Sequence, residues 1–341
     1  MTIRTGIIGL GKAGMLRLRI SRVMDNVDVL AVADSSKRRL QVAKRLGVKE
    51  LYNNYNELLR SADVDAVIIS LPNFLHKESI VAATEADKHI FIEKPLARTS
   101  VECKEVMRLA EKRGIKLMAG HNYRFLGCVK KVKSIYEKGM IGDVELSTFE
   151  LVYDGFSPTL EPTPMPEWYF DVEKIGGWLL DAGYHLIDLF QWFFGDAEVL
   201  YAHLGSRFHL PYEDHAIIVL GSKNGTAKGV LNVGWFSKLT FPQFNFRVIL
   251  HGTAGFISTD QFVPRNLYIH AAKEGIKNVL RRALGIEIRP LTYTYFYSSY
   301  AEELRHFFTC IENDSTPIVT AQDAFRVIRT IEEIYSMHNG S

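Results

Sequence analysis

The sequence contains little cysteine, no long apolar run and almost no excess charge. The three cysteines (Cys103, Cys128 and Cys310) are odd in number and far apart, which excludes a disulfide framework and a CxxC metal site. No run approaches the roughly 18 apolar residues of a membrane-spanning helix. The first residues lack the apolar core and cleavage site of a signal peptide. We therefore expect a cytoplasmic protein with no integral membrane contact.

Charge and composition exclude several further classes. Lys and Arg number 41 against 39 Asp and Glu, a net charge of +2, so the chain has no global electrostatic footprint for nucleic acid. Hydrophobic residues make up 47% and charged residues 23%, which excludes disordered and fibrous proteins. The 341 residues suffice for about two domains of roughly 150 residues each.

The first 120 residues alternate short apolar runs with amphipathic stretches. Runs such as Val27–Ala33 and His89–Ile92 are almost continuously apolar, whereas Ser36–Leu46 and Ser100–Arg113 have helical spacing. This alternation is typical of a parallel sheet with helices on both faces. We predict a doubly wound α/β domain over residues 1–121.

The rest of the chain has a different pattern. Strand-like runs follow one another, and Ala216–Leu220 and Thr226–Phe236 are joined by Ser222-Lys223-Asn224-Gly225, a hairpin signal. Hairpins favour a mostly antiparallel sheet, so we predict an α+β domain over residues 122–317. The final helix, at about residues 318–338, is expected to pack back on the first domain.

Two segments stand apart from this pattern. Ser157–Trp168 contains four prolines and is predicted to be an ordered or lid-like loop. Ala271–Leu284 combines an apolar face with four cations. It predicts either a membrane-surface or nucleotide-contacting helix, or an excursion that packs on the domain or on a subunit neighbour.

A glycine motif points to a dinucleotide. Gly9-Leu10-Gly11-Lys12-Ala13-Gly14 follows an apolar strand and precedes a helical run. Glycine is needed there for a tight turn, for close approach to the diphosphate and for helix–strand packing. The next strand ends in Asp34, an acid that suits the ribose hydroxyls of NAD. We predict a Rossmann domain that binds NAD. NADP is left open because four neighbours could accept a 2′-phosphate: Ser35, Ser36, Lys37 and Arg38.

A lysine follows a predicted strand at the position where a ligand is expected. Glu93-Lys94-Pro95 comes directly after the strand His89–Ile92. The carboxyl ends of strands face the ligand crevice in a doubly wound sheet, so Lys94 is expected to point toward the nicotinamide. An ammonium group there can stabilise an alkoxide. The alternative is an exposed lysine paired with a nearby acid.

A second chemical motif lies in the run from Gly176 to Asp188. Asp181 and His185 are four residues apart and are predicted to share one helix face, with Asp188 one turn further. A carboxylate beside a histidine is a natural acid/base pair. The residues alone leave three alternatives: a core histidine, a cap formed by Asp181, or a metal site formed by Asp181, His185 and Asp188.

These motifs, in this order, resemble one enzyme family over nearly the whole chain. They are the glycine motif, Pro72-Asn73-x-x-His76, Glu93-Lys94-Pro95, the Gly176–Asp188 run and Gly252-Thr253-Ala254-Gly255. The family is glucose–fructose oxidoreductase/inositol dehydrogenase/rhizopine catabolism (Gfo/Idh/MocA). The resemblance implies an NAD(P)-dependent dehydrogenase that acts on a secondary hydroxyl of a sugar, polyol or sugar derivative. It also implies a homodimer or homotetramer formed through the open face of the second domain's sheet.

The resemblance also implies roles for individual residues. His185 is expected to take the hydroxyl proton, Lys94 to stabilise the alkoxide and Asp181 to orient His185, in a cleft between the domains. The Lys94–Pro95 bond is expected to be cis. Cofactor contacts are expected at Leu71, Pro72, Asn73, His76, Glu93 and Lys94. Around these residues we place further substrate contacts at Tyr123, Arg124, Trp168 and Tyr184, on the chemistry of their side chains. Core packing is the alternative for each of the aromatic residues.

One departure and three alternatives qualify this interpretation. Trp178 stands where many members have a third glycine, and an indole there could reshape the substrate pocket. Within the dehydrogenases, the substrate could be a nucleotide sugar oxidised at C3. In another reaction class, the protein could be an NAD-dependent glycosidase with no net redox change. In a third class, it could be a non-catalytic NAD-binding regulator, although the presence of Lys94, Asp181 and His185 together argues against this.

Overall fold

The computed structural model describes residues 2–154, 167–208, 210–236, 244–263, 267–285 and 297–339. These residues form two compact units. The first comprises residues up to 122, residues 300–325 and a short stretch from residue 278. The second comprises residues 123–277, the described residues 297–299 and the residues from 326 to 339. The domain bounds expected from the sequence, and the packing of the final helix on the first domain, stay predictions.

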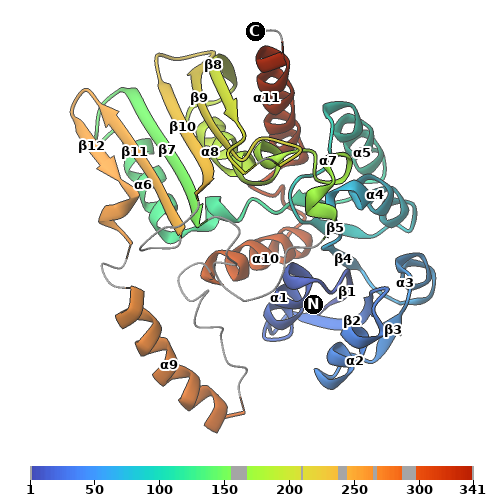
Figure 1. Ribbon diagram of the computed structural model, residues 1–341. Coiled ribbons are helices and arrows are strands. Elements are labelled where there is room, and N and C mark those ends of the chain that lie inside the picture. Colours follow the sequence, from blue (N-terminus) through green and yellow to red (C-terminus); the bar gives the residue numbers. More distant parts are fainter. Residues whose placement is uncertain are drawn as a thin grey trace. The chain divides into compact units, whose positions relative to one another are not determined.

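The first unit is built on a six-stranded parallel sheet with the order β3-β2-β1-β4-β5-β6 (Figure 1). This confirms the predicted doubly wound α/β domain. Its strands are β1 (Ile3–Ile8), β2 (Val27–Ala33), β3 (Glu50–Tyr52), β4 (Ala66–Ile69), β5 (His89–Ile92) and β6 (Leu117–Ala119). Its connecting helices are α1 (Lys12–Ser21), α2 (Lys37–Arg45), α3 (Tyr55–Ser61), α4 (His76–Glu85) and α5 (Ser100–Lys112).

Local sequence sets several of these helix starts. The side chains of Ser36, Asn54 and Thr99 accept hydrogen bonds from backbone N–H groups in the first turns of α2, α3 and α5. Such caps satisfy amides that have no partner inside the helix. The strands β1, β4 and β5 are almost completely buried on both faces, which explains the continuous apolar runs Ala66–Ile69 in β4 and Ile90–Ile92 in β5.

The second unit contains a six-stranded mixed sheet with the order β12-β11-β7-β10-β9-β8. Only β7 and β10 pair in parallel, so the predicted mostly antiparallel sheet is confirmed. The predicted hairpin joins β9 and β10, where the Ser222 N–H donates to the Ala227 carbonyl at 2.9 Å. The strands are β7 (Val144–Asp154), β8 (Ala197–Gly205), β9 (His215–Ser222), β10 (Lys228–Phe236), β11 (Phe244–Gly252) and β12 (Gly255–Ser258).

The two faces of this sheet differ. One face is buried and packs against helix α8 (Tyr184–Phe194), through residues that include Phe149 and Leu231. Strand register and side-chain alternation place a set of exposed apolar residues together on the other face. We call this set the open face: Leu146, Tyr201, Ile217, Val230 and Phe256.

The remaining elements are helical. They are α6 (Gly127–Glu137), α7 (Val172–Ile175), α9 (Leu267–Ala283), α10 (Tyr297–Glu312) and α11 (Ala321–Asn339), with short turns η1 (Asn73–Leu75), η2 (Asn122–Phe125), η3 (Glu167–Phe170) and η5 (Thr259–Gln261). The basic segment is therefore a helix, and Ile276, Val279 and Leu280 on it are exposed. Residues 157–166 of the predicted proline-rich loop lie outside the described residues. Among the helices described, none is long and apolar enough to cross a membrane.

Candidate active site

The carboxyl ends of the central strands of the first unit lie level with one another. Ile8 at the end of β1 pairs with Ile69 of β4, and Ile69 pairs with Ile92 of β5. Neighbouring strands are about 4.8 Å apart. Three predicted segments therefore begin at one edge of the sheet: the glycine motif, the segment Leu71–Asn73, and Glu93 with Lys94.

The three motif glycines have three different surroundings. Gly9 has a φ of +87°, and a Cβ there would lie 2.5 Å from the Ser70 carbonyl oxygen. A Cβ on Gly14 would lie 1.8 Å from the Gly9 carbonyl oxygen, so α1 packs directly on the turn. A Cβ on Gly11 would meet nothing within 4 Å. The open space at Gly11, just before the N-terminus of α1, fits the diphosphate of a dinucleotide.

Asp34 lies beside this turn. Its carboxylate accepts hydrogen bonds from the backbone N–H groups of Leu10, at 2.6 Å, and Ser36, at 2.7 Å. The Arg39 guanidinium is 3.6 Å away. The predicted acid is thus held at the rim of the glycine turn, in the place that suits a ribose hydroxyl. Ser35 and Arg38, two of the four residues that left NADP open, are exposed near it.

His76 connects two of the segments at the sheet edge. Its Nδ1 lies 2.6 Å from the Pro95 carbonyl oxygen, and its Nε2 lies 2.9 Å from the Leu71 carbonyl oxygen. Complete burial lowers the pKa of the imidazole and outweighs the two carbonyl contacts, which act in the opposite direction. The Lys94–Pro95 peptide is cis, as expected. His76 therefore links the segment after β4, through Leu71, to the segment after β5, through Pro95.

Glu93 is fixed by an ion-pair cluster that the sequence motifs do not reveal. The buried Arg17 guanidinium of α1 donates to Glu93 at 2.7 Å and to Glu303 of α10 at 2.8 Å. The guanidinium also lies 4.5 Å from the centroid of the Phe91 ring. Arg17 orients Glu93 immediately before Lys94.

The segment that carries Asp181 differs from the prediction. The sequence predicted one α-helix through Asp181 and His185, whereas Leu179–Gly183 forms a π-helix, η4, and the α-helix α8 begins at Tyr184. A Cβ at Gly183 would lie 2.3 Å from the Leu179 side chain, so this side chain packs against the glycine. Short π-helical turns often occur at functional sites. Asp181 and His185 therefore stand on two joined elements rather than on one regular helix.

His185 is held between aromatic rings at the start of α8. The Tyr123 ring lies 4.3 Å from the imidazole, centroid to centroid, and the Tyr184 ring lies 6.3 Å away. Tyr123 in turn meets Phe246 edge-on at 4.8 Å. His185 is only 7% exposed. These contacts restrict the imidazole orientation, which a group that transfers protons requires.

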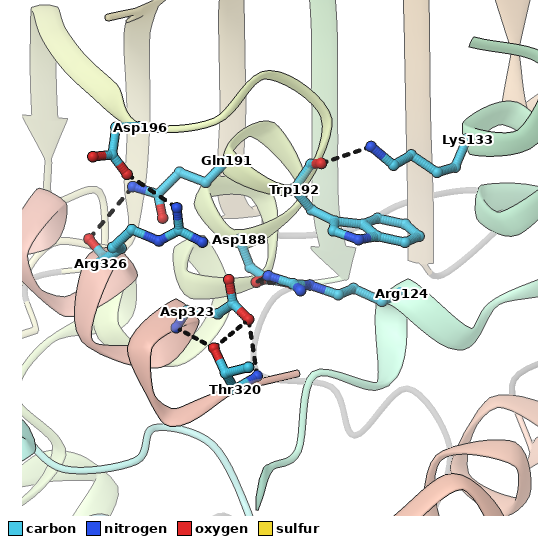
Figure 2. A network of polar contacts seen from close by, with 9 residues as sticks. All are labelled: Arg124, Lys133, Asp188, Gln191, Trp192, Asp196, Thr320, Asp323 and Arg326. Carbon is cyan, nitrogen blue, oxygen red and sulfur yellow. Dashed lines mark hydrogen bonds and ion pairs between the residues drawn. The ribbon is translucent and has the colours of Figure 1, made fainter. Parts of the chain in front are cut away.

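The other predicted substrate residues have different surroundings. The Arg124 guanidinium donates to the Asp188 carboxylate of α8 at 2.5 Å, and both side chains are 2% exposed (Figure 2). The carboxylate that Arg124 contacts in this structure therefore belongs to the protein itself, on Asp188. Tyr184 is completely buried, and Trp168 is half-buried in η3. Trp178 is buried, with its ring 4.0 Å from that of Trp235.

Two residues beside Asp181 were missed from the sequence. Tyr212 is buried near Asp181, and burial together with the charges of Asp181 and Glu213 raises the pKa of its phenol. Glu213 accepts a hydrogen bond from the Leu179 N–H, the first amide of η4, at 2.7 Å. A sequence signal could have identified them: four consecutive titratable residues lead into β9, in the run Tyr212-Glu213-Asp214-His215. Among the residues that the structure describes, no group of His, Cys, Asp and Glu could hold a metal ion.

Comparison with known proteins identifies the class. Residues 3–121 match a family model described as an oxidoreductase family with an NAD-binding Rossmann fold. Residues 133–341 match the C-terminal alpha/beta domain of the same family. The chain therefore belongs to the Gfo/Idh/MocA family of oxidoreductases, as the sequence motifs indicated. Residues 3–121 thus form the NAD-binding domain of an oxidoreductase of this family.

Particular relatives add detail. The chain is 27% identical to myo-inositol 2-dehydrogenase of Thermotoga maritima over 94% of its length and 92% of that protein. It is 30% identical to 2,7-anhydro-N-acetylneuraminate hydratase of Mediterraneibacter gnavus over 76% of its length and 67% of that protein. A scyllo-inositol dehydrogenase of Lactobacillus casei, solved with NAD(H) and scyllo-inositol, has a TM-score of 0.80 and 21% identity, with 99% of this chain and 98% of that one covered.

Proposed function

We propose that this protein oxidises a ring hydroxyl of a cyclic polyol of the inositol type, or of a closely related sugar, with NAD. The observation that carries this proposal is the level alignment of β1, β4 and β5, which brings the glycine motif and Lys94 to one edge of the sheet. The similarity to myo-inositol 2-dehydrogenase over almost the whole chain supports the polyol substrate.

The cofactor residues of this chain fit NAD. The open space at Gly11 suits the diphosphate, and Asp34 is held where it can accept hydrogen bonds from ribose hydroxyls. Asn73, Pro72 and Leu71 follow β4 at the same edge, with His76 fixing that loop. When bound, NAD supplies the hydride acceptor of the reaction.

We assign the catalytic work to three residues, Lys94, His185 and Asp181. We assign Lys94 to binding the substrate hydroxyl oxygen and stabilising its negative charge as the proton leaves. His185, oriented by the Tyr123 ring, takes that proton as general base. Asp181 orients His185 and the substrate from η4. A general base and an electrostatic stabiliser each contribute roughly 10²–10⁴ in rate.

The buried residues near His185 have supporting roles. We assign Tyr123 and the half-buried Trp168 to the substrate side of the site. Arg124 instead anchors α8 through its buried ion pair with Asp188, and Tyr184 packs beneath His185.

The test is an assay of the purified protein with NAD and a panel of substrates. Absorbance of NADH reports turnover of myo-inositol, scyllo-inositol, free sugars, sugar phosphates and nucleotide sugars. Turnover of a cyclic polyol supports the proposal, and activity confined to nucleotide sugars would favour the nucleotide-sugar 3-dehydrogenase. Binding of NAD without turnover of any compound would contradict the proposal and favour the regulator.

Variants test the assigned residues. Lys94→Met and His185→Asn should each lower kcat at least 10²-fold, because each removes a general base or an electrostatic contact. Binding of NADH, measured by fluorescence titration, should change less than threefold. The matched controls are Lys112→Met on α5 and His203→Asn on β8, both exposed, which should keep wild-type kinetics. Wild-type kcat in either active-site variant would show that its assignment is wrong.

A redox-neutral reaction is the second candidate, because a hydratase is 30% identical to this chain. In such a reaction a transient oxidation is reversed before product release, so NADH does not accumulate. Incubation with an anhydro-sugar or a glycoside and NAD, followed by mass spectrometry, distinguishes the two. Product formed without NADH would establish the second candidate.

We further propose a cytoplasmic homo-oligomer, a dimer or a tetramer. The buried cysteines Cys103, Cys128 and Cys310 form no disulfide within the part of the chain that the structure describes, which suits a reducing compartment. The open face places five exposed apolar side chains on one side of a sheet, a pattern typical of a protein interface.

A further inference from the structure

A carboxylate and a phenol meet at the start of the turn that carries Asp181. Glu213 precedes β9, and its Oε1 accepts hydrogen bonds from the Leu179 N–H at 2.7 Å and from the Tyr335 hydroxyl of α11 at 2.5 Å. The Tyr335 oxygen lies 3.4 Å from the Gly176 carbonyl oxygen. All of these residues belong to the second unit. Glu213 therefore caps the first amide of η4, two residues before Asp181.

The glycine pair before η4 is shaped by this contact. Gly177 has a φ of +108°. A Cβ there would lie 2.1 Å from the Tyr335 hydroxyl oxygen and 2.9 Å from Glu213 Oε1. The second glycine of the motif is required because the phenol and the carboxylate approach its backbone so closely.

The contact has an electrostatic cost. Burial raises the pKa of the Glu213 carboxyl, although its hydrogen bonds to Tyr335 and to the Leu179 amide act in the opposite direction. Burial and the Glu213 charge also raise the pKa of the Tyr335 phenol, which therefore stays protonated and donates. The buried Glu213 carboxylate costs stability when it is charged, yet it caps the turn before Asp181. Residues that lower stability and are nevertheless retained are typical of functional sites.

We propose that Glu213 and Tyr335 are positioning residues of this enzyme. Through the Leu179 amide they hold η4, and with it Asp181 and the first turn of α8, in the geometry that the reaction needs. This inference rests on the proposed function, since it assigns its effect to the same site. Displacement of a reacting group by about 1 Å can cost on the order of 10² in rate.

The experiment uses the full-length protein and two kinds of measurement. The variants are Glu213→Gln, Glu213→Ala and Tyr335→Phe, and the matched controls are Glu145→Gln on β7, which is exposed, and Tyr136→Phe on α6, which is half-buried. Hydrogen–deuterium exchange, followed by mass spectrometry of peptides covering residues 178–186, reports the hold on η4 without any substrate. Steady-state kinetics with NAD and the polyol reports kcat and KM separately.

We expect faster exchange of the 178–186 peptides in all three variants, about tenfold or more for Glu213→Ala. We expect kcat to fall on the order of 10²-fold in Glu213→Ala and less in Glu213→Gln, which keeps an acceptor for the Leu179 amide. KM for NAD should stay within threefold of wild type, because the cofactor residues lie in the other unit. This partial rescue by glutamine distinguishes positioning from general loss of structure.

Two results would overturn the inference. Unchanged exchange in Glu213→Ala and Tyr335→Phe would show that the pair does not hold η4. Faster exchange with kcat within twofold of wild type would show a structural contact with no positioning role. A wild-type protein that turns over no substrate would instead contradict the proposed function, and the exchange data would still decide whether Glu213 and Tyr335 hold the turn.

Discussion

The glycines of the dinucleotide turn have different tasks, and single substitutions should separate them. Gly14→Ala places a methyl group against the Gly9 carbonyl, 1.8 Å from it before relaxation, and should destabilise the fold by about 1–3 kcal/mol or more. Gly11→Ala meets no atom within 4 Å and has an ordinary extended backbone, so its melting temperature should match wild type. Its affinity for NADH should fall at least tenfold, because the methyl group occupies the diphosphate space.

Thermal melts and fluorescence titration with NADH check this pair. The two variants are controls for each other, since each adds one methyl group to the same turn. Wild-type NADH affinity in Gly11→Ala would contradict the placement of the diphosphate. Wild-type melting of Gly14→Ala would contradict the close packing of α1 on the turn.

His76 predicts a particular dependence of stability on pH. Its ordinary pKa is 6.5, and burial lowers the pKa in the folded state. Above about pH 6.5 neither state binds the proton and the stability contribution is complete. As the pH falls from 6.5 toward the lowered pKa, the unfolded chain binds a proton first, so the free energy of unfolding decreases.

The measurement is urea unfolding of wild type and His76→Gln between pH 5 and 8. The stability advantage of wild type over the variant should shrink as the pH falls below 6.5. Taking the difference removes the contributions of His89 and His306, whose pKa values burial also lowers. An advantage that stays constant, or grows toward low pH, would contradict the assignment.

At the residue scale, the sequence predicts those site residues whose environment is local. The glycines and Asp34 are identified by their spacing after β1 and β2, and Lys94 by its place after β5. Only a run of titratable neighbours marks Glu213 in the sequence, and no pattern marks Tyr335. The first is 34 residues from the amide it caps, and the second is 122 residues from Glu213. Contacts over such separations are decided by packing, which leaves no spacing rule in the sequence.

At the scale of elements, Arg17 joins α1, β5 and α10. Arg17→Ala should lower the free energy of unfolding by about 3–5 kcal/mol, because it leaves the carboxylates of Glu93 and Glu303 without their cation in a buried site. Urea or thermal unfolding measures the loss. Arg22→Ala, at the exposed end of α1, is the matched control and should cost less than about 0.5 kcal/mol. A similar small effect in Arg17→Ala would show that the cluster is not stabilising.

The sequence predicts most of the longer strands and helices correctly, but it does not predict the junction between η4 and α8. The strands β2 and β5 have the predicted bounds, because their apolar runs are uninterrupted. Amphipathic spacing likewise predicts α2 and α5 to within one residue at each end. The short β3 and α3 were not predicted, since three and seven residues carry too little pattern. The π-helix η4 was predicted as α-helix because a four-residue spacing resembles both.

At the scale of the whole molecule, the open face predicts assembly. Ile217 lies on that face and is 45% exposed. Wild-type protein should have a mass in solution that is a multiple of 38.8 kDa, and Ile217→Asp should shift it toward 38.8 kDa. Light scattering coupled to gel filtration measures both. The control is Val101→Asp, on α5 of the first unit and 73% exposed, which should leave the mass unchanged. A wild-type monomer would contradict the proposed oligomer.

The ion pair between Arg17 and Glu303 also affects when the first unit becomes stable during synthesis of the chain. Its partners are 286 residues apart, so Glu303 is synthesised last among the charges of that cluster. At roughly 5–20 residues per second, Glu303 follows Arg17 out of the ribosome by about 15–60 s. During synthesis the nascent first unit holds a cation with only Glu93 as its anion. We therefore expect the first unit to reach its final stability only after most of the chain has been made.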